Sequence, residues 1–367
     1  MPLPMFGQKQ ARAVKKITYT LAIAAGKGGV GKSTVAVNLA RALRLMGFNV
    51  GIMDADVYGP SVRKMLPEDE MPIQKGEMLT PALCSGISMI SMAYFQQGSA
   101  AAVVRAPIAN GIVSQFINNV EWGALDYLLI DFPPGTGDIQ LTLAQKGNLI
   151  GAVMVTTPQE IAIIDVRKAI HMFDLVRVPI IGVIENMSGY YHKESDETFY
   201  LFGQGGGEKL AVECGAPFLG RIPIDPELSL RGDQGLSIFA GKKDSHCSSA
   251  DAFFEIAKKI HEHTQSLEAN QADCMIKKII QNDKATFTIE WSDGVILDYS
   301  LSDLQKRCPC AKCMDASTGK RMIDETSIDL NVRAKKIMNV GRYALRIEFT
   351  TGCSSGIYDF NILRNDL

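Results

Sequence analysis

Apolar and polar positions follow two patterns along the first three quarters of the chain. Short, nearly continuous apolar runs, which indicate strands buried on both faces, are separated by segments with apolar residues at helical spacing. This alternation predicts an α/β fold with a mainly parallel sheet and helices on both of its faces. Strands are expected at 17–25, 48–56, 127–131, 149–156, 178–185 and 217–221, and helices at 35–43, 161–175, 207–214 and 253–263.

A change of pattern near residue 262 predicts a second domain. Residues 264–274 are rich in Gln, Asn and Ser, a composition typical of a linker. A chain of 367 residues is long enough for two domains. We therefore expect an α/β domain at 1–262, a linker at 263–280 and a small cysteine-containing α+β domain at 281–367.

A glycine-rich loop lies between the first predicted strand and the first predicted helix. Its glycines allow backbone N–H groups to surround a phosphate, which the helix N-terminus also attracts. In such a loop Lys32 is expected to reach the β and γ phosphates, Ser33 to ligate Mg²⁺ and Thr34 to bind the α phosphate. Lys27 stands at the loop entrance, and its side chain is expected to reach another subunit. The loop reads Gly26-Lys27-Gly28-Gly29-Val30-Gly31-Lys32-Ser33-Thr34.

Three aspartates follow two further predicted strands. Asp54 and Asp56 end one of these strands, and Asp131 ends the other. Open α/β sheets bind ligands at the carboxyl ends of their strands. We expect Asp54 and Asp131 to hold the water shell of Mg²⁺ and Asp56 to orient an attacking water. The predicted catalytic residues of a nucleotide-hydrolysing site are therefore Lys27, Lys32 and Asp56.

Charge and composition exclude several other classes of function. The net charge of −2 gives no global basic surface for nucleic acid. No uninterrupted apolar run approaches the roughly 20 residues of a membrane helix, and the N-terminal segment has no export signal. We therefore expect a cytoplasmic protein without nucleic-acid or membrane partners. In such a protein the eight cysteines are expected to be reduced thiols or metal ligands.

The motifs together resemble the Mrp family of deviant P-loop ATPases, which carry iron–sulfur clusters. The resemblance extends to about residue 262 and implies ATP, since Asn186 and Pro223 match residues beside the adenine. It also implies a face-to-face homodimer, in which Lys27 reaches the partner's nucleotide, and apo iron–sulfur proteins as clients. Besides the loop, it rests on the blocks Asp54-Ala55-Asp56-Val57-Tyr58-Gly59-Pro60-Ser61, Trp122-Gly123-Ala124-Leu125-Asp126-Tyr127, Asp131-Phe132-Pro133-Pro134-Gly135-Thr136-Gly137-Asp138, Thr156-Thr157-Pro158-Gln159, Glu185-Asn186-Met187-Ser188 and Gly203-Gln204-Gly205-Gly206-Gly207.

One segment departs from the family pattern. After Asn-Met-Ser the family usually carries a Cys-x-x-Cys pair that holds a cluster across the dimer. Here the two positions are His192 and Ser195, and residues 189–202 contain no cysteine. Because iron–sulfur centres are held by sulfur, we expect this loop to bind a cluster poorly.

The last quarter of the chain contains a separate group of thiols. This segment resembles the N-terminal domain of γ-butyrobetaine hydroxylases, with Trp291-Ser292-Asp293-Gly294 and Ser355-Gly356-Ile357-Tyr358 among the matching blocks. The family site has three cysteines and a histidine, and this chain places a fourth cysteine at the histidine position. Four thiolates suit Zn²⁺ or an iron–sulfur centre, and unmetallated thiols are the other alternative. The four cysteines are Cys308, Cys310, Cys313 and Cys353.

Two functional classes follow from these observations. The first is an ATP-hydrolysing iron–sulfur cluster carrier that delivers clusters to apoproteins. The second is a P-loop ATPase of the positioning, partitioning or chaperone type that carries no cluster. Positioning relatives need a basic tail or face. Because a cysteine-bearing domain follows the ATPase segment here, we favour the carrier.

Overall fold

The computed structural model describes most of the chain outside its N-terminus and several loops. The described residues are 17–56, 59–94, 106–240, 249–273, 276–308, 313, 322, 328–329, 332–340, 344–351 and 356–365.

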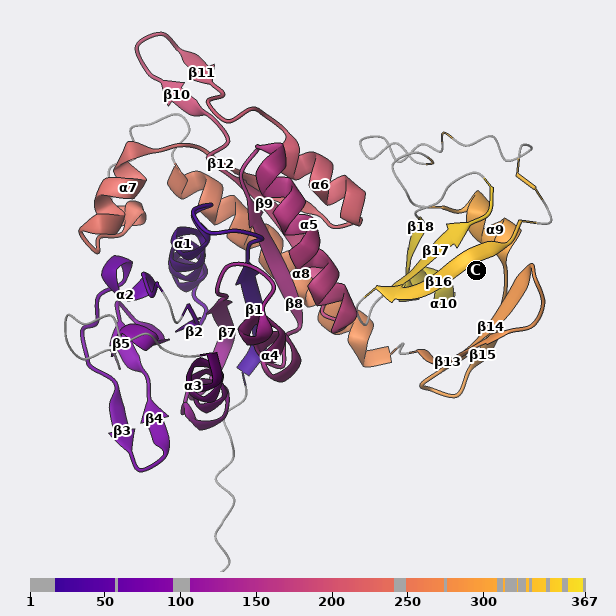
Figure 1. Ribbon diagram of the computed structural model, residues 1–367, viewed down its shortest axis with the longest axis horizontal. Helices are drawn as coiled ribbons and strands as arrows, with labels where there is room; N and C mark the ends of the chain where they lie inside the picture. Colours follow the sequence, from indigo (N-terminus) through magenta and orange to yellow (C-terminus); the bar gives the residue numbers. More distant parts are fainter. Residues whose placement is uncertain are drawn as a thin grey trace, which may run out of the picture.

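A mainly parallel sheet of eight strands forms the centre of the first part of the chain (Figure 1). The strand order is β12-β9-β8-β1-β7-β2-β6-β5, and every neighbouring pair is parallel except β5 and β6. The predicted fold class is therefore confirmed. The strands are β1 (Ile17–Ala24), β2 (Val50–Asp54), β5 (Ala82–Cys84), β6 (Ile87–Ser91), β7 (Leu125–Asp131), β8 (Gly151–Thr156), β9 (Ile180–Asn186) and β12 (Phe218–Ile222).

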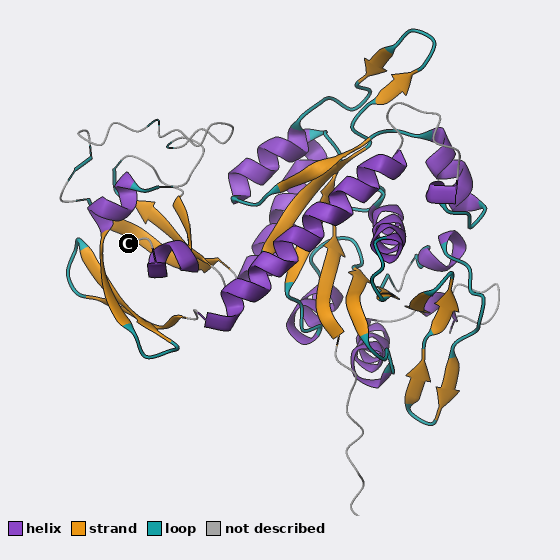
Figure 2. Cartoon of the chain, turned by 180° about the vertical axis from the view of Figure 1, so that it is seen from behind, coloured by secondary structure: helices purple, strands orange, loops and turns teal. Residues whose placement is uncertain are grey.

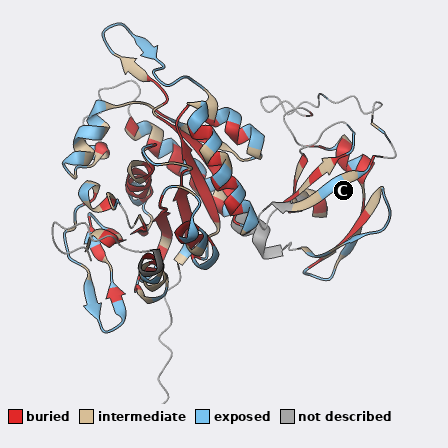
Figure 3. Cartoon of the chain, viewed as in Figure 1, coloured by how far each residue is buried: buried red, intermediate tan, exposed pale blue. Residues whose placement is uncertain are grey.

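Helices cover both faces of this sheet and bury two separate cores. One core lies under α1 (Lys32–Leu45), α2 (Val62–Met65) and α8 (Ser249–Asp273). The other lies under α3 (Ala106–Asn119), α4 (Asp138–Lys146), α5 (Glu160–Leu175) and α6 (Gly206–Cys214). The central strands, coloured red in Figure 3, are buried on both sides, as their continuous apolar sequence requires.

Several smaller elements lie outside the alternating pattern and were not predicted. Two hairpins are formed by β3 (Ile73–Lys75) with β4 (Met78–Thr80) and by β10 (Tyr190–His192) with β11 (Glu197–Phe199). Helix α7 (Pro226–Asp233) begins after Asp225, whose side chain accepts a hydrogen bond from the Glu227 N–H. Short 3₁₀ helices lie at Met92–Tyr94 and Ile238–Ala240.

The segment expected to be a linker, 263–280, consists mostly of helix and strand. Helix α8 continues through this segment to Asp273, and the next strand begins at Ile276 (Figure 2). Buried Thr264 accounts for part of the extension, because its hydroxyl lies 3.0 Å from the hydroxyl of Tyr127. The Gln, Leu, Glu and Ala residues that follow are also strong helix formers.

The last part of the chain has a core of its own around Trp291, Phe287 and Tyr358. Two antiparallel sheets of three strands each enclose this core together with two short helices. Within the described residues, no helix combines the length and apolar character needed to cross a bilayer. The elements are β13 (Ile276–Gln281), β14 (Thr286–Trp291), β15 (Ile296–Ser300), α9 (Leu301–Lys306), β16 (Ala334–Val340), β17 (Ala344–Phe349), β18 (Gly356–Asp359) and α10 (Phe360–Asn365).

Candidate functional site

The glycine-rich loop connects β1 to α1 and packs tightly at two of its glycines. Gly29 and Gly31 have φ values of +82°, a conformation that favours glycine. A Cβ at Gly31 would lie 2.3 Å from Nδ2 of Asn186, and one at Gly26 would lie 2.1 Å from the backbone of Asp165. The loop therefore requires glycine at these positions, and its middle, Gly28 and Gly29, stays exposed.

Lys32 and Asp131 form a buried ion pair beside this loop. The Lys32 Nζ donates to Asp131 Oδ1 at 2.5 Å and to Ser33 Oγ at 3.3 Å. Both side chains are buried, with exposed fractions of 7% and 0%. Burial raises the pKa of Asp131, while the Lys32 charge opposes this shift. The second carboxylate oxygen of Asp131 has no hydrogen-bond partner among the described residues.

Asp54 lies next to Asp131 because β2 and β7 are neighbours in register. Its carboxylate accepts hydrogen bonds from the Ser91 hydroxyl at 2.8 Å and from the Asp56 N–H at 3.2 Å. Burial, and secondly the charge of Asp131, raises the pKa of Asp54 to about 7. The sheet thus brings together two of the three predicted aspartates.

Asp56 lies just beyond the end of β2 and is partly exposed. Its Oδ1 accepts a hydrogen bond from the Gly59 N–H at 3.2 Å. The charge of Asp56 contributes to the raised pKa of Asp131, so the two carboxylates are electrostatic neighbours. Lys27, at the entrance of the loop, is also partly exposed.

The donor set suits a magnesium ion. Mg²⁺ prefers oxygen ligands and usually keeps several of its waters, so it is bound through few protein groups. Two adjacent carboxylates with raised pKa values, one with an oxygen that has no partner in the described part of the chain, provide such ligands. The Ser33 hydroxyl lies at the same place, within reach of Lys32.

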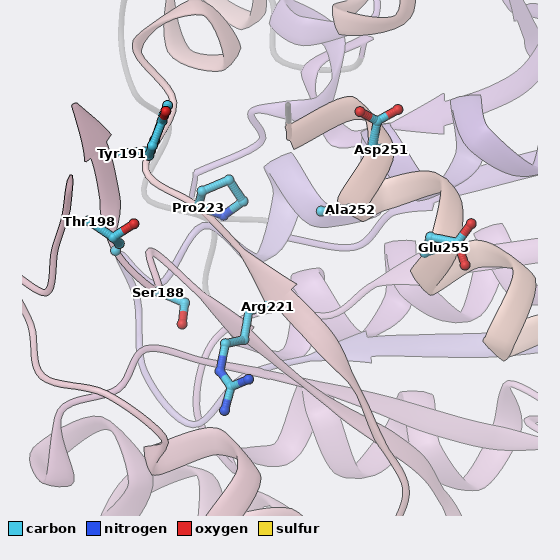
Figure 4. A pocket seen from close by; sticks show the side chains of 9 residues that line it. Ser188, Tyr191, Thr198, Arg221, Pro223, Asp251, Ala252 and Glu255 are labelled. Atoms are coloured by element: carbon cyan, nitrogen blue, oxygen red, sulfur yellow. The ribbon is translucent and has the colours of Figure 1, made fainter. Parts of the chain in front are cut away.

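Asn186 contacts the loop, whereas Pro223 lies at a separate pocket. Asn186 is buried, and its Nδ2 donates to the Val30 carbonyl at 2.8 Å. Pro223 follows β12 and lines a pocket of about 360 Å³ that does not include Asn186. Figure 4 shows Pro223 between Tyr191 and Thr198 on one side and Asp251 and Glu255 of α8 on the other. The pocket is lined by Ser188, Gly189, Tyr191, Thr198, Arg221, Pro223, Asp251, Ala252 and Glu255.

Comparison with known proteins identifies the first part of the chain. Residues 16–261 match the NUBPL iron-transfer P-loop NTPase model of the ParA group, and this match spans more than half of the chain. The chain belongs to this family. The resemblance expected from the sequence is therefore confirmed. Residues 278–364 match a second model, the N-terminal domain of γ-butyrobetaine hydroxylase-like proteins.

Individual relatives agree with the family match. An iron–sulfur cluster carrier protein of Synechocystis sp. is 44% identical over 255 residues, which cover 68% of this chain and 72% of that protein. The chloroplastic Fe–S cluster assembly factor HCF101 of Oryza sativa subsp. japonica is 35% identical over 372 residues, covering 96% of this chain and 65% of that protein. The match to HCF101 therefore includes both parts of the chain.

A solved structure also resembles this iron-transfer P-loop NTPase. A nucleotide-binding protein from Archaeoglobus fulgidus, solved in complex with ADP, is 38% identical to the chain. The two structures superpose with a TM-score of 0.53 over 60% of this chain and 87% of that chain.

The β10–β11 hairpin of this NTPase contains His192 and Ser195, the two positions where the resemblance leads us to expect cysteines. The two side chains are neighbours, with 3.0 Å between the Nδ1 of His192 and the Oγ of Ser195. The turn therefore brings both positions together, but neither side chain supplies sulfur. An iron–sulfur cluster does not fit this pair of donors. At the end of β11 and just after it, the side chains of Phe199, Tyr200 and Leu201 have exposed fractions of 46%, 46% and 64%.

The structure describes two of the four C-terminal cysteines. Cys308 and Cys313 are buried in the core of the second part, whereas Cys310 and Cys353 lie outside the described residues. No group of three or more His, Cys, Asp or Glu side chains arranged for a metal occurs in the described part. Burial raises the pKa of the Cys84 thiol to about 12 and that of the Cys214 thiol to about 11, which keeps both thiols protonated.

Glu185, a buried carboxylate beside Asn186, was not predicted as a site residue. Glu185 accepts hydrogen bonds from the Ser188 hydroxyl and, at 2.7 Å, from the Gly207 N–H. It thereby joins the end of β9 to the start of α6. Its position at the end of a buried strand was a signal, because the same signal identified Asp54 and Asp131.

Proposed function

We propose that the protein is an ATP-hydrolysing iron–sulfur cluster carrier that delivers clusters to apoproteins. The observation that carries this proposal is the buried group of Lys32, Asp54 and Asp131 beside the phosphate-binding loop, in a chain of the iron-transfer family. Family membership supports nucleotide hydrolysis in general. ATP as the substrate, and the coupling of its hydrolysis to cluster transfer, are the further steps of the proposal.

The loop residues would bind and orient the nucleotide. In this proposal Gly26 to Gly31 surround the phosphates with backbone N–H groups, and Thr34 binds the α phosphate. Lys32 exchanges its bond with Asp131 for the β and γ phosphates. Asn186, which the Val30 carbonyl orients, and Pro223 would contact the adenine.

Mg²⁺ would be held by Ser33 directly and by Asp54 and Asp131 through its water shell, where it would neutralise phosphate charge. Asp56, partly exposed beside these groups, is the proposed base or orienting group for the attacking water. Both carboxylates must be ionised to attract the cation, so we expect magnesium affinity to fall as the pH drops below about 7, the pKa of Asp54.

A homodimer would complete the site. Lys27 is partly exposed at the loop entrance, and we propose that it contacts the nucleotide of the partner subunit. Burying exposed apolar side chains near the loop favours association, since apolar burial stabilises interfaces. Ile161 and Ile164 of α5 are 67% and 46% exposed close to Gly26, which packs on Asp165.

Cluster carriage is supported by the relatives, which are named iron–sulfur cluster carrier protein and Fe–S cluster assembly factor. Because the hairpin lacks sulfur, we propose that the second part contributes thiolates. Its quartet Cys308, Cys310, Cys313 and Cys353 would hold either a structural Zn²⁺ or a cluster.

A specific observation favours a second candidate, an ATPase that no longer carries a cluster. The hairpin positions that should hold sulfur contain His192 and Ser195. In that case the quartet would bind zinc only, and the dimer would act on clients without delivering iron.

The two lysines of the loop test the proposed ATPase. Lys32→Ala should abolish ATP binding and turnover, because the loop loses its phosphate ligand in cis. Lys27→Ala should leave binding within about twofold of wild type and lower turnover roughly 100-fold or more, since removal of a trans cation weakens mainly the transition state. Binding is measured by titration with a fluorescent ATP analogue, and turnover by phosphate release.

Lys146→Ala, which removes an exposed lysine at the end of α4, is the matched control and should behave like wild type. Wild-type turnover in the Lys27→Ala variant would refute the trans contact, and unchanged ATP binding in Lys32→Ala would refute the proposed nucleotide site.

A further inference from the structure

The loop between β7 and α4 is fixed at its first residues. The Phe132 N–H donates to the Ile23 carbonyl at 3.0 Å, and the Asp131 carbonyl accepts from the Ala55 N–H at 3.1 Å. These bonds connect the end of β7 to the ends of both neighbouring strands, β1 and β2. The chain therefore leaves β7 in a defined direction immediately after the carboxylate that binds Lys32.

The next two residues, Pro133 and Pro134, cannot donate backbone hydrogen bonds because proline has no N–H. Their carbonyls are instead bound by one side chain from α4. The Gln140 Nε2 donates to the Pro134 carbonyl at 2.5 Å and lies 3.5 Å from the Pro133 carbonyl. Gln140 is itself buried, with an exposed fraction of 7%. A buried amide thus reaches back along the chain to hold a loop whose tip is exposed.

The Gln140 side chain also restricts the space for a side chain at Gly137, at the far end of the loop. A Cβ at Gly137 would lie 3.1 Å from Oε1 of Gln140, a tight contact, and Gly135 has a φ of +92°. The amide therefore lies between the proline carbonyls and the start of α4. Pro134, Thr136 and Gly137 are exposed in this loop, and Gly135 is partly exposed.

We infer that Gln140 is a positioning residue for nucleotide hydrolysis. It holds the Pro133-Pro134-Gly135 backbone at a fixed place next to Asp131, whose partner Lys32 is the lysine that reaches the terminal phosphates. This inference rests on the ATPase activity proposed above. Gln140 contacts the loop backbone, so it would act on the rate of the reaction by fixing the loop that directly follows Asp131.

The Gln140 side chain acts on the loop as a hydrogen-bond donor. A variant whose donor is present only at low pH therefore tests this role. A carboxylate at position 140 only accepts hydrogen bonds and repels the proline carbonyls, whereas a protonated carboxyl group donates again. In a buried position that faces carbonyl oxygens, the pKa of a glutamate is raised. Gln140→Glu should therefore lack the donor at high pH and regain it at low pH.

The experiment compares Gln140→Glu and Gln140→Met with wild type, in the full chain, from pH 8 to pH 5. At pH 8 both variants should lose about 10- to 100-fold in kcat, as small misplacements of reacting groups typically cause. Their KM for ATP should stay within about twofold, because the phosphate-binding loop is unchanged. As the pH falls, the ratio of wild-type to variant kcat should shrink for Gln140→Glu and stay constant for Gln140→Met.

Gln145→Glu places the same charge on an exposed position of the same helix and should match wild type throughout. Three results would each overturn the positioning role. The first is a kcat within twofold of wild type in folded Gln140→Met, and the second is a KM for ATP that rises in proportion to the loss of kcat. The third is a ratio of wild-type to Gln140→Glu kcat that does not change with pH. Absence of turnover in wild type would instead contradict the proposed function, so the two failures are distinguishable.

Discussion

At the scale of single residues, the site concentrates charge where water is excluded. Lys32 neutralises one oxygen of Asp131, while Asp54 relies on hydrogen bonds from Ser91 and the Asp56 N–H. Burying ionised carboxylates is costly unless they are paired or bind a cation. The raised pKa values of Asp54 and Asp131 express that cost. We interpret the surplus of negative charge as the feature that attracts Mg²⁺ together with the nucleotide.

The raised pKa of Asp54 makes stability depend on pH. Between its ordinary pKa near 4 and its folded pKa of about 7, folded Asp54 holds a proton that the unfolded chain releases. Stability must therefore fall as the pH rises through this window. Asp54→Asn is neutral at every pH, so its Tm relative to wild type should rise by roughly 2 to 6 °C between pH 5 and pH 8.

Thermal unfolding without nucleotide or magnesium measures this difference. Asp233→Asn, at an exposed position at the end of α7, is the control and should give a pH-independent difference. Parallel Tm curves for wild type and Asp54→Asn would show that Asp54 does not hold a proton in this window.

At the scale of elements, the sequence predicted what depends on local pattern. The buried strands β1, β7, β8 and β9 were found because each is a mainly apolar run, and the loop and its aspartates were found because they lie at strand ends. The β10–β11 hairpin was missed because its strands have only three residues each and are exposed or half-buried, so they form no apolar run. The extension of α8 was missed because Gln, Asn and Ser indicated a linker, although Thr264 is buried.

Residues that act through tertiary contacts could not be found in the same way. Gln140 resembles any polar residue of a helix until its distance to the Pro134 carbonyl is known. Ser91 likewise gains its place only because β6 pairs with β2. Sequence pattern therefore predicts the ligands of a site better than the residues that support them.

Two cysteines in the turn of the β10–β11 hairpin should create an iron-binding pair. Because the turn brings the side chains of residues 192 and 195 together, His192→Cys with Ser195→Cys should place two thiolates at one point of each subunit. The double variant should bind iron and sulfide during anaerobic reconstitution at a level at least about threefold above wild type, since iron–sulfur centres are held by cysteine. Elemental iron and acid-labile sulfide are the measurements.

Lys193→Cys with Glu194→Cys adds the same number of thiols to the same turn and is the matched control. We expect it to bind less iron than the first variant, because neighbouring residues of a turn point their side chains apart. Equal iron and sulfide in both double variants would contradict a specific site at 192 and 195.

At the scale of the whole molecule, the chain joins a nucleotide site to a cysteine-containing part. Each part has its own hydrophobic core, and the rice HCF101 match spans both. They approach each other where Ile357 packs on Gly215 after α6, so closely that a Cβ at Gly215 would lie 2.2 Å from Ile357. We retain the division at 1–262 and 281–367 as a proposal, with thiolates of the second part serving the ATPase of the first.

Transfer of a cluster to an apoprotein tests whether the chain is an ATP-dependent cluster carrier. The full chain, reconstituted with iron and sulfide and then desalted, is mixed anaerobically with an apo-ferredoxin, and formation of the holo acceptor is followed by its visible absorbance. We expect faster transfer with Mg-ATP than with a non-hydrolysable analogue, and no effect of ATP on transfer by the Lys32→Ala variant. A wild-type chain that retains no iron and sulfide, or that transfers them at the same rate with and without ATP hydrolysis, would show that the chain is not an ATP-dependent cluster carrier.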